Sequence, residues 1–232
     1  MIRLRKNKQK PRRLITREDP KSPLAEAFRS LRTNIKFANV EKEIKSILVT
    51  SAGPGEGKST VLANLAVAMA QAGQTVLVID CDMRKPVQHK IFELHNGKGL
   101  THFLLDKASL DEVIRPTAVE NLSVLTTGTI PPNPSELLET KKFAALLEQL
   151  GEQYDRILVD SPPAGAVTDS VILSRIIDGV ILAVYAEKTK VEQVKYVQEQ
   201  MKKTGAKILG VVLTHTARKG RSYQYYHYYG EE

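Results

Sequence analysis

Residues 51–60, SAGPGEGKST, place three glycines, a lysine and two adjacent hydroxyl side chains directly after an apolar, β-branched run. Residues 52–59 fit the P-loop pattern, with alanine at the position of its first glycine. Glycines let backbone N–H groups turn toward an anion, and the N-terminus of the following helix adds partial positive charge. The stretch therefore predicts a phosphate-binding loop between a strand and a helix.

The side chains of this loop suit a nucleoside triphosphate. Lys58 can reach the β- and γ-phosphates, and the hydroxyl of Ser59 can hold Mg²⁺. The alternative is a glycine-rich loop that contains GKS by chance. The strand-like run before the loop and the helix-like run after it disfavour that alternative.

A nucleotide site also needs a carboxylate for the metal ion. In RILVDSPP, Asp160 ends an apolar strand in the manner of a Walker B motif. Many strands end in aspartate, so this prediction depends on the P-loop being present.

Two further carboxylates follow the strand after the P-loop helix. In TVLVIDCDMRKP, Asp80 and Asp82 alternate, so they point the same way from an extended chain. Ligands of open parallel sheets lie at the carboxyl ends of strands, and we expect the pair to face the phosphates. One acid could support the metal and the other could accept a proton from an attacking hydroxyl. The alternative is a solvated loop in which Arg84 and Lys85 offset both acids.

The chain end is rich in tyrosine. Five of the eight tyrosines lie within seven residues, at Tyr223, Tyr225, Tyr226, Tyr228 and Tyr229. An aggregation-prone β segment is one alternative, although nearby basic residues and glycines oppose it. Stacking on single-stranded nucleic acid is another.

Elements of two kinds alternate along the chain. We expect strands at 46–50, 75–80, 122–126, 156–160, 179–185 and 207–214, and helices at 59–72, 135–150, 168–176 and 189–203. Residues 84–121 are less regular, with short helices expected near 100–105 and 109–114. Alternation of this kind predicts an α/β fold with a doubly wound, mostly parallel sheet.

An additional helix precedes the first strand. Ser22 is a plausible cap with Pro23 in the first turn. Glu26, Arg29 and Arg32 are expected together on the polar side of this helix.

Composition and charge narrow the class of protein. The chain has 232 residues, 42% of them hydrophobic, and we expect one domain. Its longest apolar runs have the length of strands, and its single cysteine, Cys81, excludes an internal disulfide. The net charge of +8 is concentrated in residues 1–13, which hold seven basic groups and no acid. This arm is solvated or contacts anionic lipid, and no recognition-helix pattern indicates specific nucleic-acid binding.

These motifs resemble those of a known family. VLVIDCDMRKP resembles the Walker A′ motif of bacterial protein tyrosine kinases, the P-loop kinases of capsule and exopolysaccharide systems. SAGPGEGKST, ILVDSPP, EAFRSLRTNI and a terminal tyrosine cluster complete the set in the same order. The resemblance covers residues 14–229. It implies a P-loop NTPase fold with an extra N-terminal helix and flexible termini.

The resemblance implies a role for each motif. ATP and Mg²⁺ are the expected cofactors, with Lys58, Asp80 and Asp82 catalytic and with Ser59, Asp80 and Asp160 at the metal. Asp82, which lies further beyond the strand, is favoured over Asp80 as the base for a tyrosine hydroxyl. The nucleotide-binding residues would be Gly53, Pro54, Gly55, Glu56, Gly57, Lys58, Ser59 and Thr60.

The resemblance also implies an assembly. Glu26, Arg29 and Arg32 match an ExxRxxR motif that closes a ring of kinase subunits, whereas an ordinary amphipathic surface helix is the alternative. The expected organisation is a basic flexible arm at 1–21, a kinase domain at 22–216 with the oligomerisation helix at 23–37, and a tyrosine-rich tail at 217–232.

The expected function is ATP-dependent phosphorylation of tyrosine in other proteins. The tail tyrosines would be phosphorylated in trans within the homo-oligomer. This activity would regulate capsule or exopolysaccharide production. A transmembrane activator would recruit the cytoplasmic chain to the inner face of the membrane. The alternative is a partitioning or division-site ATPase switch without kinase activity. Such ATPases carry a second lysine where this chain has Gly53, and they lack the tyrosine cluster. Many of them also end a later strand with asparagine, where this chain has Thr214 and His215.

Overall fold

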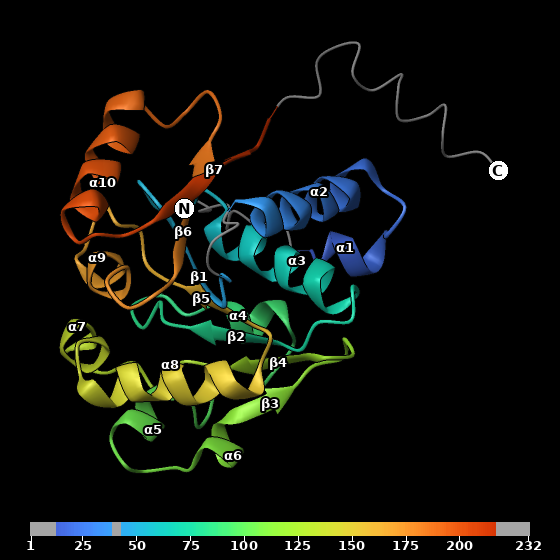
Figure 1. The fold of residues 1–232 in the computed structure, drawn as a ribbon. Helices are drawn as coiled ribbons and strands as arrows, with labels where there is room; N and C mark the ends of the chain where they lie inside the picture. The colour runs from blue at the N-terminus through green and yellow to red at the C-terminus, as the bar shows by residue number, and fades with distance from the viewer. Residues whose placement is uncertain (1–12, 39–42, 217–232) are drawn as a thin grey trace, which may run out of the picture.

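The structure is a computed structural model that describes residues 13–38 and 43–216. The five tail tyrosines and residues 1–12 of the predicted arm lie outside the described residues. The described chain forms a seven-stranded sheet in the order β3-β4-β2-β5-β1-β6-β7, with helices on both faces (Figure 1). Every neighbouring pair is parallel except β3 and β4. The predicted doubly wound, mostly parallel sheet is confirmed.

The strands match the apolar runs of the sequence. They are β1 Ser46–Ser51, β2 Val76–Asp80, β3 Ile114–Pro116, β4 Leu122–Leu125, β5 Arg156–Asp160, β6 Gly179–Tyr185 and β7 Ile208–Thr214. β1 and β2 are buried at every position, as expected of strands covered on both faces. Among these strands only β3 was not predicted. Its three residues, none of them buried and the last a proline, are too few to show the alternation of apolar and polar side chains that marks a strand.

The helices follow the same alternation. They are α1 Ile15–Glu18, α2 Pro23–Phe37, α3 Lys58–Ala70, α4 Gln88–Ile91, α5 Leu100–Leu104, α6 Leu110–Val113, α7 Pro134–Leu138, α8 Lys141–Gln153, α9 Asp169–Leu173 and α10 Val191–Lys203. The single helix predicted at 135–150 is wrong, because Thr140 starts a new helix. Its hydroxyl accepts a hydrogen bond from the backbone N–H of Phe143 at 3.3 Å, as an N-cap does.

Part of the predicted basic arm belongs to the folded domain. In α1, Thr16 is fully buried and donates both its backbone N–H and its hydroxyl to Asn64 Oδ1 of α3. Asn64 in turn donates its amide to the carbonyl of Arg13. Arg13 and Thr16 are therefore held on α3, and this part of the predicted arm packs on the domain.

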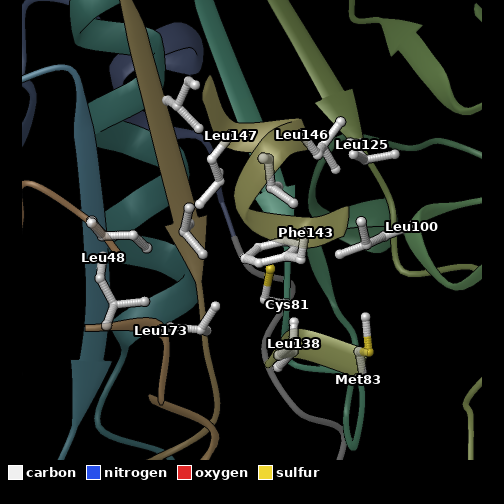
Figure 2. Close-up of a cluster of buried hydrophobic side chains, with 14 of the residues drawn as sticks. Leu48, Cys81, Met83, Leu100, Leu125, Leu138, Phe143, Leu146, Leu147 and Leu173 are labelled. Carbon is white, nitrogen blue, oxygen red and sulfur yellow. The ribbon is translucent and has the colours of Figure 1, made fainter. Parts of the chain in front are cut away.

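The two faces of the sheet bury separate apolar clusters. Residues from α2, α3 and α4 fill one cluster, and residues from α5 to α10 fill the other. Figure 2 shows Cys81 and Met83 projecting into the second cluster beside Leu138 and Phe143. Because residues of an extended chain alternate, this arrangement turns the acids at 80 and 82 toward the face that carries α3.

Candidate functional site

The P-loop occupies the turn from β1 into α3. Gly55 and Gly57 have φ values of +77° and +87°, which side chains other than glycine rarely adopt. Lys58, Ser59 and Thr60 form the first turn of α3. The loop therefore has the left-handed backbone and the helix N-terminus that phosphate binding requires.

Glu56 fixes the shape of this loop from inside. Its buried carboxylate accepts the backbone N–H of Ala52 at 3.1 Å through Oε2 and the hydroxyl of Thr189 at 2.6 Å through Oε1. The sequence placed Glu56 only among the nucleotide-binding residues. The structure adds a tie between the P-loop and the turn after β6.

The end of β7 closes against the same loop. The hydroxyl of Thr214 donates to the carbonyl of Glu56 at 2.7 Å, and a Cβ on Gly57 would lie 3.3 Å from Thr214 Cγ2. His215, at φ 55°, stacks on Tyr185 with ring centroids 4.0 Å apart. The residue that replaces the expected asparagine thus braces the P-loop.

Lys58 joins two of the predicted acids. Its Nζ lies 2.8 Å from Asp82 Oδ2, 3.2 Å from Asp160 Oδ1 and 3.1 Å from the hydroxyl of Ser59. Burial alone would lower the pKa of Lys58, but the charges of Asp160 and Asp82 outweigh burial and raise that pKa above its ordinary value. Four predicted site residues therefore meet at one point.

Asp80 and Asp82 have different partners. Asp80 Oδ2 accepts the backbone N–H groups of Val87 and Gln88, both at 2.9 Å. Burial and the neighbouring charge of Asp160 raise the pKa of Asp80 to about 8. Asp82 instead contacts Lys58 through Oδ2 and accepts the backbone N–H of Lys85 through Oδ1 at 3.0 Å. Asp82 is thus the acid of this pair that contacts the P-loop lysine.

A second ion pair supports the loop that carries Asp82. Arg84 donates to both carboxylate oxygens of Asp169, from Nε at 2.9 Å and from a terminal nitrogen at 3.0 Å. Ser135 donates its hydroxyl to the same carboxylate at 2.7 Å. Asp169 is fully buried, so the pair ties the loop after β2 to α7 and α9. The sequence offered Asp80 and Asp82 as the acids that Arg84 could offset, whereas its hydrogen-bond partners Ser135 and Asp169 lie 51 and 85 positions away.

The predicted oligomerisation residues divide into two groups. Arg29 pairs with Glu26 at 2.7 Å on the partly exposed surface of α2. Arg32 instead donates to the carbonyl of Ala68, in the last turn of α3, at 2.6 Å. Arg29 also donates to the carbonyl of Pro20 at 2.7 Å, so both arginines make contacts inside the domain, and Glu26 is the member whose contact with Arg29 stays within α2.

The donor set fits a magnesium nucleotide. The loop offers backbone N–H groups and Lys58 to phosphates, while Ser59 and Asp160 offer hard oxygen ligands of the kind that Mg²⁺ prefers. Mg²⁺ is commonly held by one or two carboxylates together with substrate phosphates, which is what these residues can supply.

Comparison with known proteins shows the family. Residues 44–210 match the model of an AAA domain. The chain is 46% identical to "Putative tyrosine-protein kinase CapB" of Staphylococcus aureus, over 94% of this chain and 96% of that protein. It is 43% identical to "Tyrosine-protein kinase YwqD" of Bacillus subtilis, over 98% and 96%. The chain belongs to the bacterial tyrosine-protein kinase family.

Solved structures agree with this family and with its P-loop NTPase fold. The "chimerical protein CapA2B2" superposes with a TM-score of 0.86 at 46% identity, covering 88% of this chain and 90% of that one. The kinase domain of the Escherichia coli tyrosine kinase ETK gives 0.83 at 31% identity, covering 94% and 88%. The described segments 13–38 and 43–216 contain no helix that is both long and apolar enough to cross a membrane.

Proposed function

We propose that this kinase transfers the γ-phosphoryl group of Mg-ATP to tyrosine hydroxyls, in other proteins and in its own tail. The tail acceptors are Tyr223, Tyr225, Tyr226, Tyr228 and Tyr229. The observation that carries the proposal is the position of Lys58 between Asp82 and Asp160 at the start of α3. The proposed phosphate-binding cation is thus within hydrogen-bond distance of both the proposed metal-binding acid and the proposed base.

Each residue has a role in this reaction. Lys58 turns from the carboxylates to the β- and γ-phosphates, and Ser59 and Asp160 would hold a metal ion, which would neutralise charge on the phosphates. The phenol oxygen forms a bond to the γ-phosphorus while the bond between the γ-phosphorus and the bridging oxygen breaks, and ADP leaves with that oxygen. Asp82, released from Lys58, accepts the phenol proton. An ordinary phenol has a pKa near 10, so proton removal during transfer assists the attack.

We propose further that the tail is phosphorylated in trans within a homo-oligomer, for which a ring is the expected form. Its acceptors lie beyond β7, outside the described residues. Each phosphate adds about −1.5 to −2 charges at pH 7, so several in neighbouring tails repel and loosen the assembly. The partly exposed side chains of Glu26 and Arg29 leave this part of α2 accessible to a neighbouring subunit.

The remaining parts of the proposal concern the setting of the enzyme. We propose that a transmembrane partner activates this cytoplasmic chain at the inner face of the membrane, and that its activity regulates capsule or exopolysaccharide production. In support, this chain aligns with only 31% of the length of "Tyrosine-protein kinase wzc" of Salmonella typhimurium, at 34% identity. The rest of that relative's sequence has no counterpart in the alignment, and we propose that a separate partner protein provides the corresponding part here.

One experiment tests the central proposal. The purified chain is incubated with Mg-ATP and probed for phosphotyrosine, beside a variant with the five tail tyrosines replaced by phenylalanine. The proposal is supported if the unmodified chain is labelled, the variant is not, and the variant still phosphorylates an added tyrosine-containing protein. Release of free phosphate without protein labelling would instead indicate the ATPase switch, a class with which the chain shares its fold. The septum site-determining protein MinD of Pyrococcus horikoshii, solved with Mg-ADP, superposes with a TM-score of 0.64 at 26% identity.

A further inference from the structure

Gln88, the first residue of α4, touches both acidic strand ends of the site. Its backbone N–H donates to Asp80 Oδ2 at 2.9 Å, and its side-chain amide donates to Asp160 Oδ2 at 2.8 Å. The same amide nitrogen donates to the carbonyl of Ser59 at 3.2 Å. One fully buried residue thus links β2, β5 and the first turn of α3.

These contacts divide the two oxygens of Asp160 between different partners. Gln88 binds Oδ2, and Lys58 binds Oδ1. The orientation of the amide is fixed, because the carboxylate and the Ser59 carbonyl are both acceptors and only the NH₂ end can donate to them. Asp160 can therefore turn its Oδ1 toward Lys58 and Ser59 while its other oxygen stays anchored.

The second end of the amide adds an independent observation. Gln88 Oε1 is buried and has no hydrogen-bond partner among the described residues. A buried acceptor without a donor is costly, and a water molecule is the usual way to satisfy it. A hydrated metal ion beside Ser59 and Asp160 brings such water into this part of the site.

We propose that Gln88 is a positioning residue for the magnesium ion of the bound nucleotide. It holds Asp160 with Oδ1 turned toward Lys58 and Ser59, where the metal ion would bind, and its own oxygen would accept a hydrogen bond from a water molecule of that ion. This inference rests on the proposed Mg-nucleotide site. It differs from a purely structural role for Gln88, which would affect the whole nucleotide pocket equally.

The test separates the metal from the nucleotide. Gln88→Met keeps the length of the side chain and the backbone donation to Asp80 but removes the amide. ADP affinity is measured by calorimetry with and without Mg²⁺, for the wild type, for Gln88→Met and for Gln149→Met, a control at an exposed glutamine of α8. We expect Mg-free affinity to be unchanged in Gln88→Met and the gain from Mg²⁺ to fall about tenfold, as for other residues that orient metal ligands. The control should keep the full gain.

Other outcomes are equally informative. An undiminished magnesium gain in Gln88→Met, or equal losses with and without Mg²⁺, would overturn the inference. If that variant does not fold, Gln88→Ala takes its place, because it also removes the amide, and its magnesium gain should fall by at least as much. An undiminished gain in Gln88→Ala would again overturn the inference. If the wild type itself gained nothing from Mg²⁺, the proposed function would be refuted, which is a distinguishable result.

Discussion

Lys58 Nζ and Asp82 Oδ2 lie 2.8 Å apart, so the cation for the triphosphate and the acid proposed as base share a hydrogen bond. Both side chains are almost fully buried, so neither finds bulk water as a substitute. Nucleotide binding must therefore exchange this contact for phosphate contacts, and that exchange releases the carboxylate. In the proposed reaction, Asp82 therefore becomes available as a base only when the phosphoryl donor is present.

Replacing Lys58 by methionine removes the cation and leaves Asp82 and Asp160 without it. We expect phosphotyrosine labelling to fall below detection, because the proposed reaction then lacks the cation that neutralises the γ-phosphate. Two buried acids lose their shared cation, which costs roughly 3–5 kcal/mol of stability, and we expect the chain to stay folded. Labelling assays and circular dichroism check this, with Lys85→Met as the control for an exposed lysine nearby. A folded variant that still labels would contradict the role of Lys58.

Asp82→Asn keeps the shape of the side chain but removes its ability to take a proton. We expect kcat for tyrosine phosphorylation to fall roughly 10²- to 10⁴-fold, the range for loss of a general base, with a smaller change in KM for ATP. Steady-state kinetics on a tyrosine-containing protein measure both values. Asp111→Asn, on the exposed surface of α6, is the matched control. A kcat within the range of this control would shift the role of base to another group.

Asp80 makes the stability of the nucleotide-free chain depend on pH. Its folded pKa, about 8, lies above the ordinary 3.8, so the protonated form is favoured in the folded state. Its contribution is complete below about pH 4 and is lost as the pH rises through 8. Asp80→Asn imitates the protonated acid and still accepts from Val87 and Gln88, so the variant should lose less unfolding free energy between pH 5 and 8. Urea titrations at several pH values test this, and equal slopes for both proteins would argue against it.

Arg84 balances the buried charge of Asp169. Arg84→Met leaves that carboxylate with Ser135 as a hydrogen-bond donor but without the guanidinium. We expect a loss of roughly 2 kcal/mol, less than for a wholly buried pair because the Arg84 side chain is 40% exposed. Urea unfolding gives the value. Lys98→Met, which breaks the surface pair with Glu112, should change the midpoint little, and an equal effect of the two substitutions would count against this view.

Local pattern was sufficient for the P-loop, for six of the strands and for the acid at the end of β5. Each of these features depends on residues close in sequence, and the spacing of such residues indicates the local backbone conformation. The role of Glu56 could not be predicted, because its partner Thr189 is 133 positions away. Gln88 was missed for the same reason, since it meets Asp160 across 72 positions. The break before α8 did have a local signal, as threonine at 140 is a favourable N-cap.

The division of the α2 motif separates assembly from folding. Within residues 13–38 and 43–216, Glu26 pairs with Arg29 at the partly exposed surface, so Glu26→Ala should lower the oligomer mass in light scattering while leaving the unfolding free energy nearly unchanged. Arg32 donates to the carbonyl of Ala68, so Arg32→Ala should also lower stability, by roughly 1–2 kcal/mol. Lys36→Ala, at an exposed position of the same helix, is the control and should change neither. If Glu26→Ala destabilised the chain as much as Arg32→Ala did, the surface pair would belong to the fold, and the proposed contact through α2 would lose its support.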